Sequence, residues 1–582
     1  MVDIEDKVPR NPKAAIPILI VWAIAILYMM FSRGLEGVSL VLFVLLTAPL
    51  IGIVYLILSY NGEGSKLYGL RDLCDRLPAV KRPEDKVHVH FKTKMIWVIA
   101  ILVIYFILTN VFIYGLDQEE TIDLFAAYRT ILAGAQGSLM HLGIGPIVTA
   151  SIIMQLFVGA KIINLDLSKE DDKATYQGVQ KLLVIIMIFV EAIPQVYGYL
   201  VPAAAFEMNL DGIWSGQGVF LARSIIIIQL FIGSYLVFLM DETISKWGIG
   251  SGISLFIAAG VSQSLFTGTL NWMPIDKSLP LSISNPPAGA IPKTFYTLTH
   301  SSASDLAGGG LESLILAPPN PLVALVGTLG IFLLVAYVES TRLEIPLAHE
   351  SGRGARGRYP IRLIYASNIP VILMAALLAN VSMFSMLLWS HPTMKNLPLI
   401  GSKWWIGAYD AETNELIAGG AWYLQSPQGL HQWLLPLSSE RYRMAYMPHH
   451  DTGQIVVWLV IYVLVMIIGS VMFARFWIET TNMGSKDVAK QIQSSGMRIP
   501  GFRREPKSME KVLDKYIPVV TVISGAFVGG LAAGADLIGT VGGASGIGVL
   551  LAVSILIQFY EAMAKEEMME MHPMLRGFFG EE

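Results

Sequence analysis

Residues 141–163 read HLGIGPIVTASIIMQLFVGAKII, an apolar run of about the length that crosses a bilayer core. Glycine and proline interrupt its start at Gly143, Gly145 and Pro146. Such interruptions are tolerated where a membrane helix is buried in protein or lines a cavity, because neighbouring groups can then satisfy the freed backbone. The stretch therefore predicts a membrane protein in which this helix borders an internal cavity.

The composition of the whole chain supports a lipid environment. Of 582 residues, 54% are hydrophobic and only 15% are charged, and the mean hydropathy is +0.57. Soluble domains contain roughly a quarter charged residues. The single cysteine, Cys74, excludes an intrachain disulfide and a thiolate zinc site.

Twelve apolar runs are predicted to span the membrane, which makes the chain an all-α polytopic membrane protein. The first two are joined by a very short turn and are expected to form a hairpin. The runs cover residues 14–31, 38–60, 95–116, 144–163, 182–200, 218–240, 251–265, 323–338, 363–388, 455–473, 516–533 and 543–560.

The basic residues predict the orientation. With twelve spans both termini share a side, and most of the 41 Lys and Arg residues fall on that side. The positive-inside rule then places both termini in the cytoplasm. Two long outer segments, 266–321 and 389–452, are rich in Pro, Gly, Ser and Trp and are expected to form irregular caps.

Six blocks are distinctive from about residue 70 onward: HLGIGPIVTASIIMQLFVGAKII (141–163), SKWGIGSGISLFIAAGVSQ (245–263), ESTRLEIPLAH (339–349), YASNIPVILMAALLAN (365–380), GFRREPKSMEKVLDKYIP (501–518) and LAAGADLIGTVGGASGIGVLLAVSI (531–555). In these blocks and their order the chain resembles SecY, the central subunit of the Sec protein-conducting channel, and most closely its archaeal form. The first 65 or so residues do not match that family.

The resemblance implies a ten-helix fold made of two pseudosymmetric, inverted five-helix halves, here with two extra N-terminal helices. The expected parts are a hairpin (1–65), a cytoplasmic linker (66–94), a first half with a plug near 121–143 (95–265), an outer loop (266–321), and a second half (322–582) with an outer loop at 389–452 and cytoplasmic loops at 340–362 and 474–515.

An aliphatic ring is expected at the centre of the pore. A narrow ring of aliphatic side chains excludes ions by dewetting and holds no passing residue strongly. From spacing alone, aliphatic pairs four residues apart in a membrane helix are ordinary core packing. The resemblance alone assigns the ring to Val148, Ile152, Ile253, Ile257, Ile372 and Leu551.

The segment 121–145 carries Asp123, Arg129 and several glycines, so it is too polar to face lipid and too apolar for an exposed loop. A short re-entrant helix buried in protein fits both properties. An amphipathic surface helix is the alternative. In the SecY family this segment is the plug that seals the resting pore, and the resemblance places it at Leu124 to His141.

A lateral gate is also expected, between runs 144–163 and 182–200 on one side and 363–388 and 455–473 on the other. The resemblance places its polar residues at Gln155 and Asn368. Polar contacts between membrane helices contribute about 0.6 to 2 kcal/mol, so an ordinary interhelical hydrogen bond is an equal alternative. Glu191, within an apolar run, is expected to have a structural hydrogen bond, although proton transfer is the other possibility.

Two basic cytoplasmic loops complete the prediction. The positive-inside rule by itself accounts for most of the basic residues in these loops. In the SecY family these loops dock the ribosome, whose RNA attracts such patches. The resemblance assigns that role to Arg356, Arg358, Arg503 and Arg504, with Arg503 in the family's Gly-aromatic-Arg position.

The function that the resemblance implies is a passive, gated channel for unfolded secretory polypeptides that also releases transmembrane segments into lipid. No GxxxxGK[ST] or HExxH motif is present, so an enzyme is not expected, and no cofactor or metal is predicted. Expected partners are a SecE-type gamma subunit and a small beta-type subunit as separate chains, the ribosome, signal peptides, nascent polypeptides and membrane lipids. The expected location is the cell (plasma) membrane. The alternatives are a secondary transporter with inverted repeats and a structural scaffold.

Overall fold

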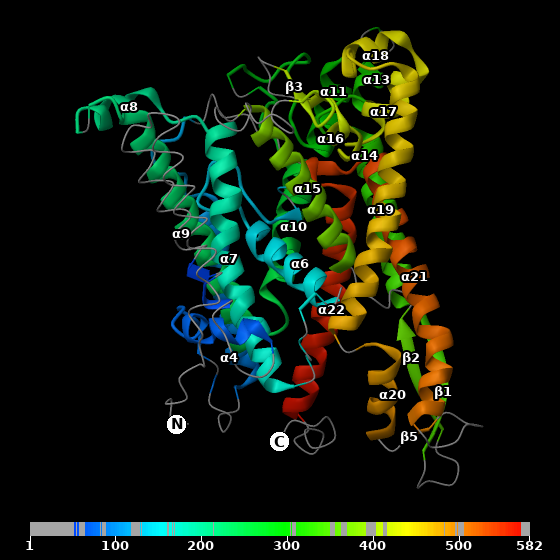
Figure 1. The fold of residues 1–582 in the computed structure, drawn as a ribbon. Helices are drawn as coiled ribbons and strands as arrows, with labels where there is room; N and C mark the ends of the chain where they lie inside the picture. Colours follow the sequence, from blue (N-terminus) through cyan, green and yellow to red (C-terminus); the bar gives the residue numbers. More distant parts are fainter. Residues whose placement is uncertain are drawn as a thin grey trace. The chain divides into compact units, whose positions relative to one another are not determined.

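The computed structural model of the chain is built mainly of long helices (Figure 1). Most of the predicted N-terminal hairpin lies outside the described residues, so its two helices stay a prediction. The structure describes residues 52–53, 55–57, 65–81, 83, 89–117, 129, 131–159, 162–163, 165, 167, 169–213, 215–276, 278–302, 304, 306, 310–349, 356–362, 369–390, 403–410, 416–481, 483–494, 497–498 and 506–571.

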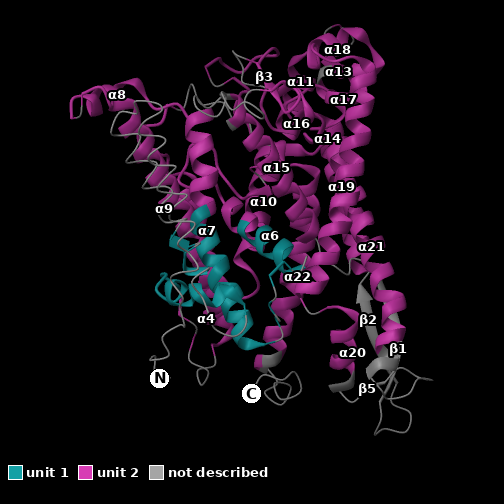
Figure 2. Ribbon diagram, viewed as in Figure 1, with its two compact units in different colours: residues 1–79, 150–186 teal, residues 80–149, 187–582 magenta. Residues whose placement is uncertain are grey.

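The chain divides into two compact units (Figure 2). Unit 1 comprises Met1–Ala79 and Ala150–Ile186, and unit 2 comprises Val80–Thr149 and Met187–Glu582. In unit 1 the short helices η2 (Lys66–Leu70) and α3 (Arg71–Cys74) bury Leu67 and Leu70 against Met154 and other apolar residues. All contacts described below lie within unit 2.

Among the described residues, nine helices are long and apolar enough to cross a membrane, and a shorter apolar helix, α6 (Gly145–Gly159), joins them. Together they correspond to the ten predicted runs from residue 95 onward, which are thereby confirmed as helices. The nine are α4 (Phe91–Thr109), α7 (Glu170–Gly198), α9 (Gly218–Trp247), α10 (Gly252–Leu270), α14 (Leu322–Ser340), α15 (Ile369–Ser390), α19 (Thr452–Thr480), α21 (Pro506–Ile538) and α22 (Gly546–Met571).

Several of these helices differ in length from the apolar runs. α7, α9 and α21 continue through polar residues beyond the run, because hydrogen bonding of the helix does not stop where lipid contact stops. α4 ends at Thr109, short of the predicted 116, since the following residues form bridges instead, Phe112 with Ser138 and Leu116 with Pro202.

Short elements cover one end of unit 2, at the top of Figure 1. They come from the described parts of the two predicted caps, 266–321 and 389–452. They are α11 (Ala290–His300), α13 (Leu311–Ile315), the strand pair β3 (Ala408–Tyr409) and β4 (Leu416–Ala418), α16 (Gly420–Tyr423), α17 (Leu430–Ser438) and α18 (Glu440–Tyr446). α8 (Ala204–Asp211) packs beside α9.

A small sheet stands at the opposite end of unit 2, beside α20 (Ser485–Ser494), and the all-helical prediction did not include it (Figure 1). Strand β1 (Arg342–His349) pairs antiparallel with β2 (Arg356–Arg362) along its length and with β5 (Met497–Arg498) at its end. The sheet therefore joins the two basic loops, which are far apart in sequence.

Candidate functional site

A buried loop, residues 131–144, lies between α4 and α6 and is the centre of the candidate site. It consists of turns after its first residues, so the predicted plug helix does not extend to His141. The reason is backbone geometry, because Ala133 and Gly137 have φ values of 52° and 66°, outside the helical region. The start of the predicted plug, 124–128, lies outside the described residues.

Hydrogen bonds from α4 and the residues that follow it hold the buried loop in place. Tyr105 Oη donates to the carbonyl of Ala133 at 2.9 Å. The amide of Ile113 donates to the carbonyl of Gly137 at 2.8 Å, and the amide of Leu139 donates to the carbonyl of Val111 at 2.9 Å. These bonds satisfy backbone groups that would otherwise be buried without partners.

His141 connects the buried loop to α7. Burial, together with the Arg129 guanidinium, lowers the pKa of His141 well below its usual value, so the imidazole is neutral. Its Nδ1 accepts from the Gly137 amide at 3.0 Å, which leaves the proton on Nε2, 3.1 Å from Tyr199 Oη. Tyr199 donates in turn to Gln195 Oε1 at 2.7 Å. The loop is thus tied to α7 by neutral hydrogen bonds.

Arg129 and Gly233 complete the seat of the buried loop. Arg129 Nη1 donates to the carbonyl of His141 at 3.0 Å and lies 3.2 Å from its Nδ1. On α9, Gly233 packs directly against the backbone of Leu139, and a Cβ at this glycine would overlap the Leu139 carbonyl oxygen. Only glycine allows the loop to lie this close to α9.

Three polar side chains meet between α6, α7 and α15, and we call them the polar cluster: Thr149, Glu191 and Asn380. Thr149 Oγ1 donates to Glu191 Oε1 at 2.7 Å, and Asn380 Nδ2 donates to Thr149 Oγ1 at 2.9 Å. Thr149 and Glu191 are buried. Glu191 therefore has the hydrogen-bonding partner expected for it, whereas Thr149 and Asn380 were not among the predicted site residues.

A small cavity of about 40 Å³ joins the buried loop to the polar cluster. Arg129 and His141 line it from the loop side, and Glu191 and Asn380 line it from the cluster side. A cavity of this volume has room for ordered water, which these polar side chains could bind. A displacement of the loop would therefore change the surroundings of the polar cluster.

The six predicted ring residues are placed as follows. Ile253 is half-buried and the other five are buried. Ile257 and Leu551 have no exposed surface, and their helices, α10 and α22, pack together. Val148 and Ile152 lie on α6, Ile253 and Ile257 on α10, Ile372 on α15, and Leu551 on α22. Their convergence into a ring stays a prediction.

The two predicted gate residues are only partly described. Gln155 is buried on α6, and its Oε1 has no hydrogen-bond partner within the described part of the chain. Asn368 lies outside the described residues, so the pairing of these two residues stays a prediction. Between α6 and α15 the structure describes another polar contact, the hydrogen bond from Asn380 to Thr149 in the polar cluster.

Of the four predicted ribosome-docking residues, two lie within the described part of the chain. Arg356 and Arg358 belong to strand β2, and Arg503 and Arg504 lie outside the described residues. Ala348 on β1 stands opposite Arg356 on one side and Arg498 of β5 on the other. The sheet thus places arginine positions of both basic loops in neighbouring strands.

Comparison with known proteins agrees with this architecture. The family profile for SecY matches residues 138–560, and the profile for the plug domain of Sec61p matches residues 103–137. The protein translocase subunit SecY of Archaeoglobus fulgidus is 44% identical over 521 residues, covering 89% of this chain and 99% of the relative.

Two solved structures are also similar. One, described as the structure of a protein conducting channel, has a TM-score of 0.66 and 38% identity and covers 87% of this chain and 98% of its own. The other is Sec61 in the canine ribosome-channel complex from the endoplasmic reticulum, with a TM-score of 0.64, 38% identity and the same coverage.

The fold and the buried loop define a multi-span membrane protein of the protein-conducting channel class. The chain belongs to the SecY family, whose members are channel subunits without enzymatic activity.

Proposed function

We propose that this chain is the central, pore-forming subunit of a protein translocase. It is a passive, gated channel that conducts unfolded secretory polypeptides and releases transmembrane segments laterally into lipid. The observation that carries this proposal is the buried loop, which neutral hydrogen bonds through His141 hold against α7 and a backbone contact at Gly233 holds against α9. These contacts are specific enough to hold the loop where it closes a pore and weak enough to let the loop leave that position.

Translocation by the purified protein would test this proposal against the transporter alternative. The chain, reconstituted with its small partner subunits, is expected to move a secretory precursor into proteoliposomes, measured as protection from added protease. Movement of small solutes without any protected precursor would contradict the proposal. The driving force must come from ribosomal synthesis or another external source.

Within this channel Leu124 to His141, whose later residues belong to the buried loop, form the plug, and the six aliphatic positions form the ring beneath it. Buried aliphatic residues on α10 and α22, which pack together, support the ring. The match of residues 103–137 to the plug domain of Sec61p supports the plug. The ring seals the resting pore by dewetting, and the plug seals it by filling space.

The polar cluster is the latch of the lateral gate, because it joins α6 and α7 to α15. Thr149→Val keeps the shape of the side chain and removes the hydroxyl that both Glu191 and Asn380 contact. With an interhelical bond contributing about 0.6 to 2 kcal/mol, the gate should open roughly 3 to 30 times more readily. The measurement is translocation of a precursor whose signal peptide has been made less hydrophobic.

Thr521→Val is the matched control for that experiment. Thr521 is also a buried threonine in a membrane helix, but within the described part of the chain its hydroxyl donates only to the carbonyl of Ile517 in its own helix. Equal translocation by the two variants would show that the polar cluster is ordinary helix packing.

The β2-β1-β5 sheet is part of the ribosome-docking surface, since it brings arginine positions of both basic loops together. Arg503→Glu should weaken binding to isolated ribosomes roughly tenfold, because it replaces an attraction to phosphate by repulsion. Ala348→Pro should also weaken binding although it removes no charge, since proline cannot donate to a neighbouring strand.

Lys490→Glu is the control, because Lys490 is an exposed cation on α20, outside the sheet. Co-sedimentation with ribosomes at physiological salt measures all three variants. Binding at full strength by Arg503→Glu would remove the docking assignment, and binding at full strength by Ala348→Pro alone would remove the sheet from it.

The proposed partners are separate SecE-type and beta-type subunits, the ribosome, signal peptides, nascent chains and membrane lipids. An apolar groove of about 260 Å³ between α14 and α22 supports a single-span partner, because Phe332, Leu556 and Tyr560 line it and are well exposed. The proposed location is the plasma membrane with both termini in the cytoplasm, which the distribution of basic residues supports.

A further inference from the structure

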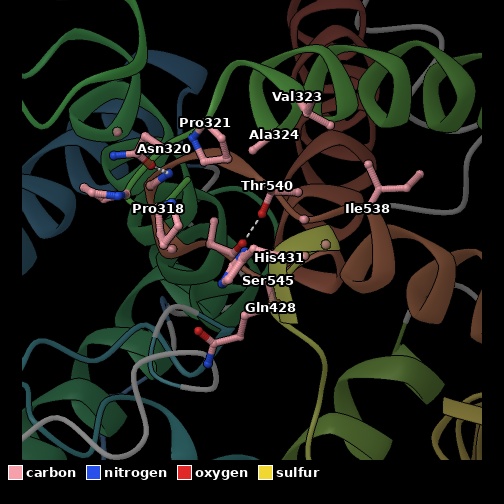
Figure 3. A pocket seen from close by; sticks show the side chains of 18 of the residues that line it. Pro318, Asn320, Pro321, Val323, Ala324, Gln428, His431, Ile538, Thr540 and Ser545 are labelled. Carbon is pink, nitrogen blue, oxygen red and sulfur yellow. Dashed lines mark hydrogen bonds between the residues drawn. The ribbon is translucent and has the colours of Figure 1, made fainter. Parts of the chain in front are cut away.

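A cavity of about 450 Å³ lies at the end of unit 2 where α10 ends and α22 begins (Figure 3). We call it the rim cavity. Its volume is within the roughly 300 to 1,000 Å³ typical of ligand-binding pockets. The end of α10 and three loops line it, and these loops are Pro318–Pro321 before α14, Ser426–Gly429 before α17, and Ile538–Ser545 between α21 and α22.

Contacts between backbones fix the walls of the rim cavity. On the α10 side, a Cβ at Gly268 would overlap the backbone of Gly542, so only glycine allows the loop to cross the helix there. On the α17 side, Gly429 has a φ of 111°, and a Cβ would lie 3.2 Å from the Cα of Gly539. Backbone atoms therefore form these walls, and rearrangement of side chains cannot easily close the cavity.

Hydrogen-bond donors are available in the rim cavity. Helix α17 begins there with Gly429 as its N-cap, so no side chain caps its first amides, and its first residues, Leu430 and His431, line the cavity. Such amides need an acceptor. Ser426 also lines the cavity, is only 5% exposed, and its hydroxyl has no hydrogen-bond partner among the described residues.

The charges in the rim cavity exclude an ionic ligand. Asp536 and His431 are the ionisable residues among those that line it. The Asp536 carboxylate already accepts from Tyr462 Oη at 2.5 Å and from the Ile547 amide at 3.4 Å. Burial lowers the pKa of His431, which leaves it neutral. The cavity therefore offers no cation to an anion and no unoccupied carboxylate to a cation.

Apolar walls complete the chemistry of the site. Pro318, Pro321, Val323 and Ile538 surround the polar centre, and Figure 3 shows their side chains around Thr540 and His431. Donors in an uncharged, partly apolar pocket suit a ligand with neutral acceptors and small or apolar side groups. Peptide carbonyls in an extended chain have this chemistry.

We propose that the rim cavity binds a short, uncharged, extended segment of the polypeptide that is leaving the channel, through hydrogen bonds to its backbone carbonyls. The inference rests on the proposed function, since α10 and α22, which border the cavity, carry Ile253, Ile257 and Leu551 of the ring. The cavity lies at the end of α10 opposite Ile253, so we place it where a chain that has passed the ring would meet it next. A few neutral hydrogen bonds would slow its return without holding it.

The test is photo-crosslinking to a secretory polypeptide stalled part-way through the reconstituted channel. A photoreactive residue replaces Gln428 at the cavity, Ile257 in the ring, or Met444 on α18, which is exposed and does not line the cavity. The stalled chain is expected to crosslink to position 428 far more than to position 444. The Ile257 position reports whether the chain occupies the channel at all.

A cavity-filling variant makes the result specific. Ala324→Trp fills the cavity from α14, and Val326→Trp places the same side chain on the exposed face of that helix. Ala324→Trp should reduce the crosslink at 428 to the level at 444 and leave the crosslink at 257 intact, whereas Val326→Trp should change neither.

Each other outcome contradicts a definite claim. A crosslink at 257 with none at 428, or a crosslink at 428 that Ala324→Trp does not reduce, overturns the rim cavity as a peptide site. A crosslink from 428 to a partner subunit instead of the stalled chain also overturns it. Absence of crosslinks at both 257 and 428 contradicts the proposed function itself.

Discussion

Replacing Ile257 and Leu551 together by serine is expected to make the reconstituted channel leak ions about tenfold faster or more, because a hydroxyl-lined constriction no longer dewets. Both residues are fully buried, and they lie on α10 and α22, which pack together. The measurement is ion flux through proteoliposomes that contain the resting channel, without a precursor.

Leu255→Ser with Val549→Ser is the matched control. These residues are also buried and lie on the same two helices, but each stands two positions from a ring residue and so faces about 200° away from it. The control should lose stability without leaking. Equal leak from the two pairs of variants would mean that Ile257 and Leu551 are ordinary core residues.

Gly233→Val should displace the buried loop and produce the second large effect. The new side chain would overlap the Leu139 carbonyl, and overpacking of this kind costs about 1 to 3 kcal/mol. The resting position of the loop should become roughly 5 to 150 times less populated relative to displaced positions. A cysteine introduced at Leu139 should then react faster with a polar thiol reagent.

Gly330→Val provides the comparison, because Gly330 lies on another membrane helix, α14, where an added Cβ meets nothing within 4 Å. Cys74 is replaced beforehand so that the introduced thiol is the only one. If Gly233→Val folds and leaves the reactivity at position 139 unchanged, the backbone contact does not hold the loop.

The membrane helices could be predicted from sequence because their signal is local. Each apolar run from residue 95 onward corresponds to a helix, and errors occur where lipid contact and helix length differ, as at α7 and α21. The helix expected in the plug segment does not reach His141, because glycine content does not reveal positive φ angles such as that of Gly137.

The polar cluster and the sheet could not be predicted in this way. Thr149 and Asn380 are 231 residues apart, and a threonine or asparagine in an apolar run is commonly satisfied within its own helix. Likewise, nothing local in the short segment at Met497–Arg498 indicates that it pairs with Ala348. The family resemblance indicated the roles of the helices, whereas these hydrogen-bonding and strand partners follow only from the three-dimensional structure.

The most direct test of the central claim is the path of a translocating chain. With a secretory polypeptide stalled in the reconstituted channel, photoreactive residues at Ile257 and Leu551 are predicted to crosslink to it, and one at Leu255 is predicted not to. Crosslinks confined to Leu255 and to lipid-exposed positions such as Ile228 on α9 would contradict the account, because the chain would then pass outside the aliphatic ring.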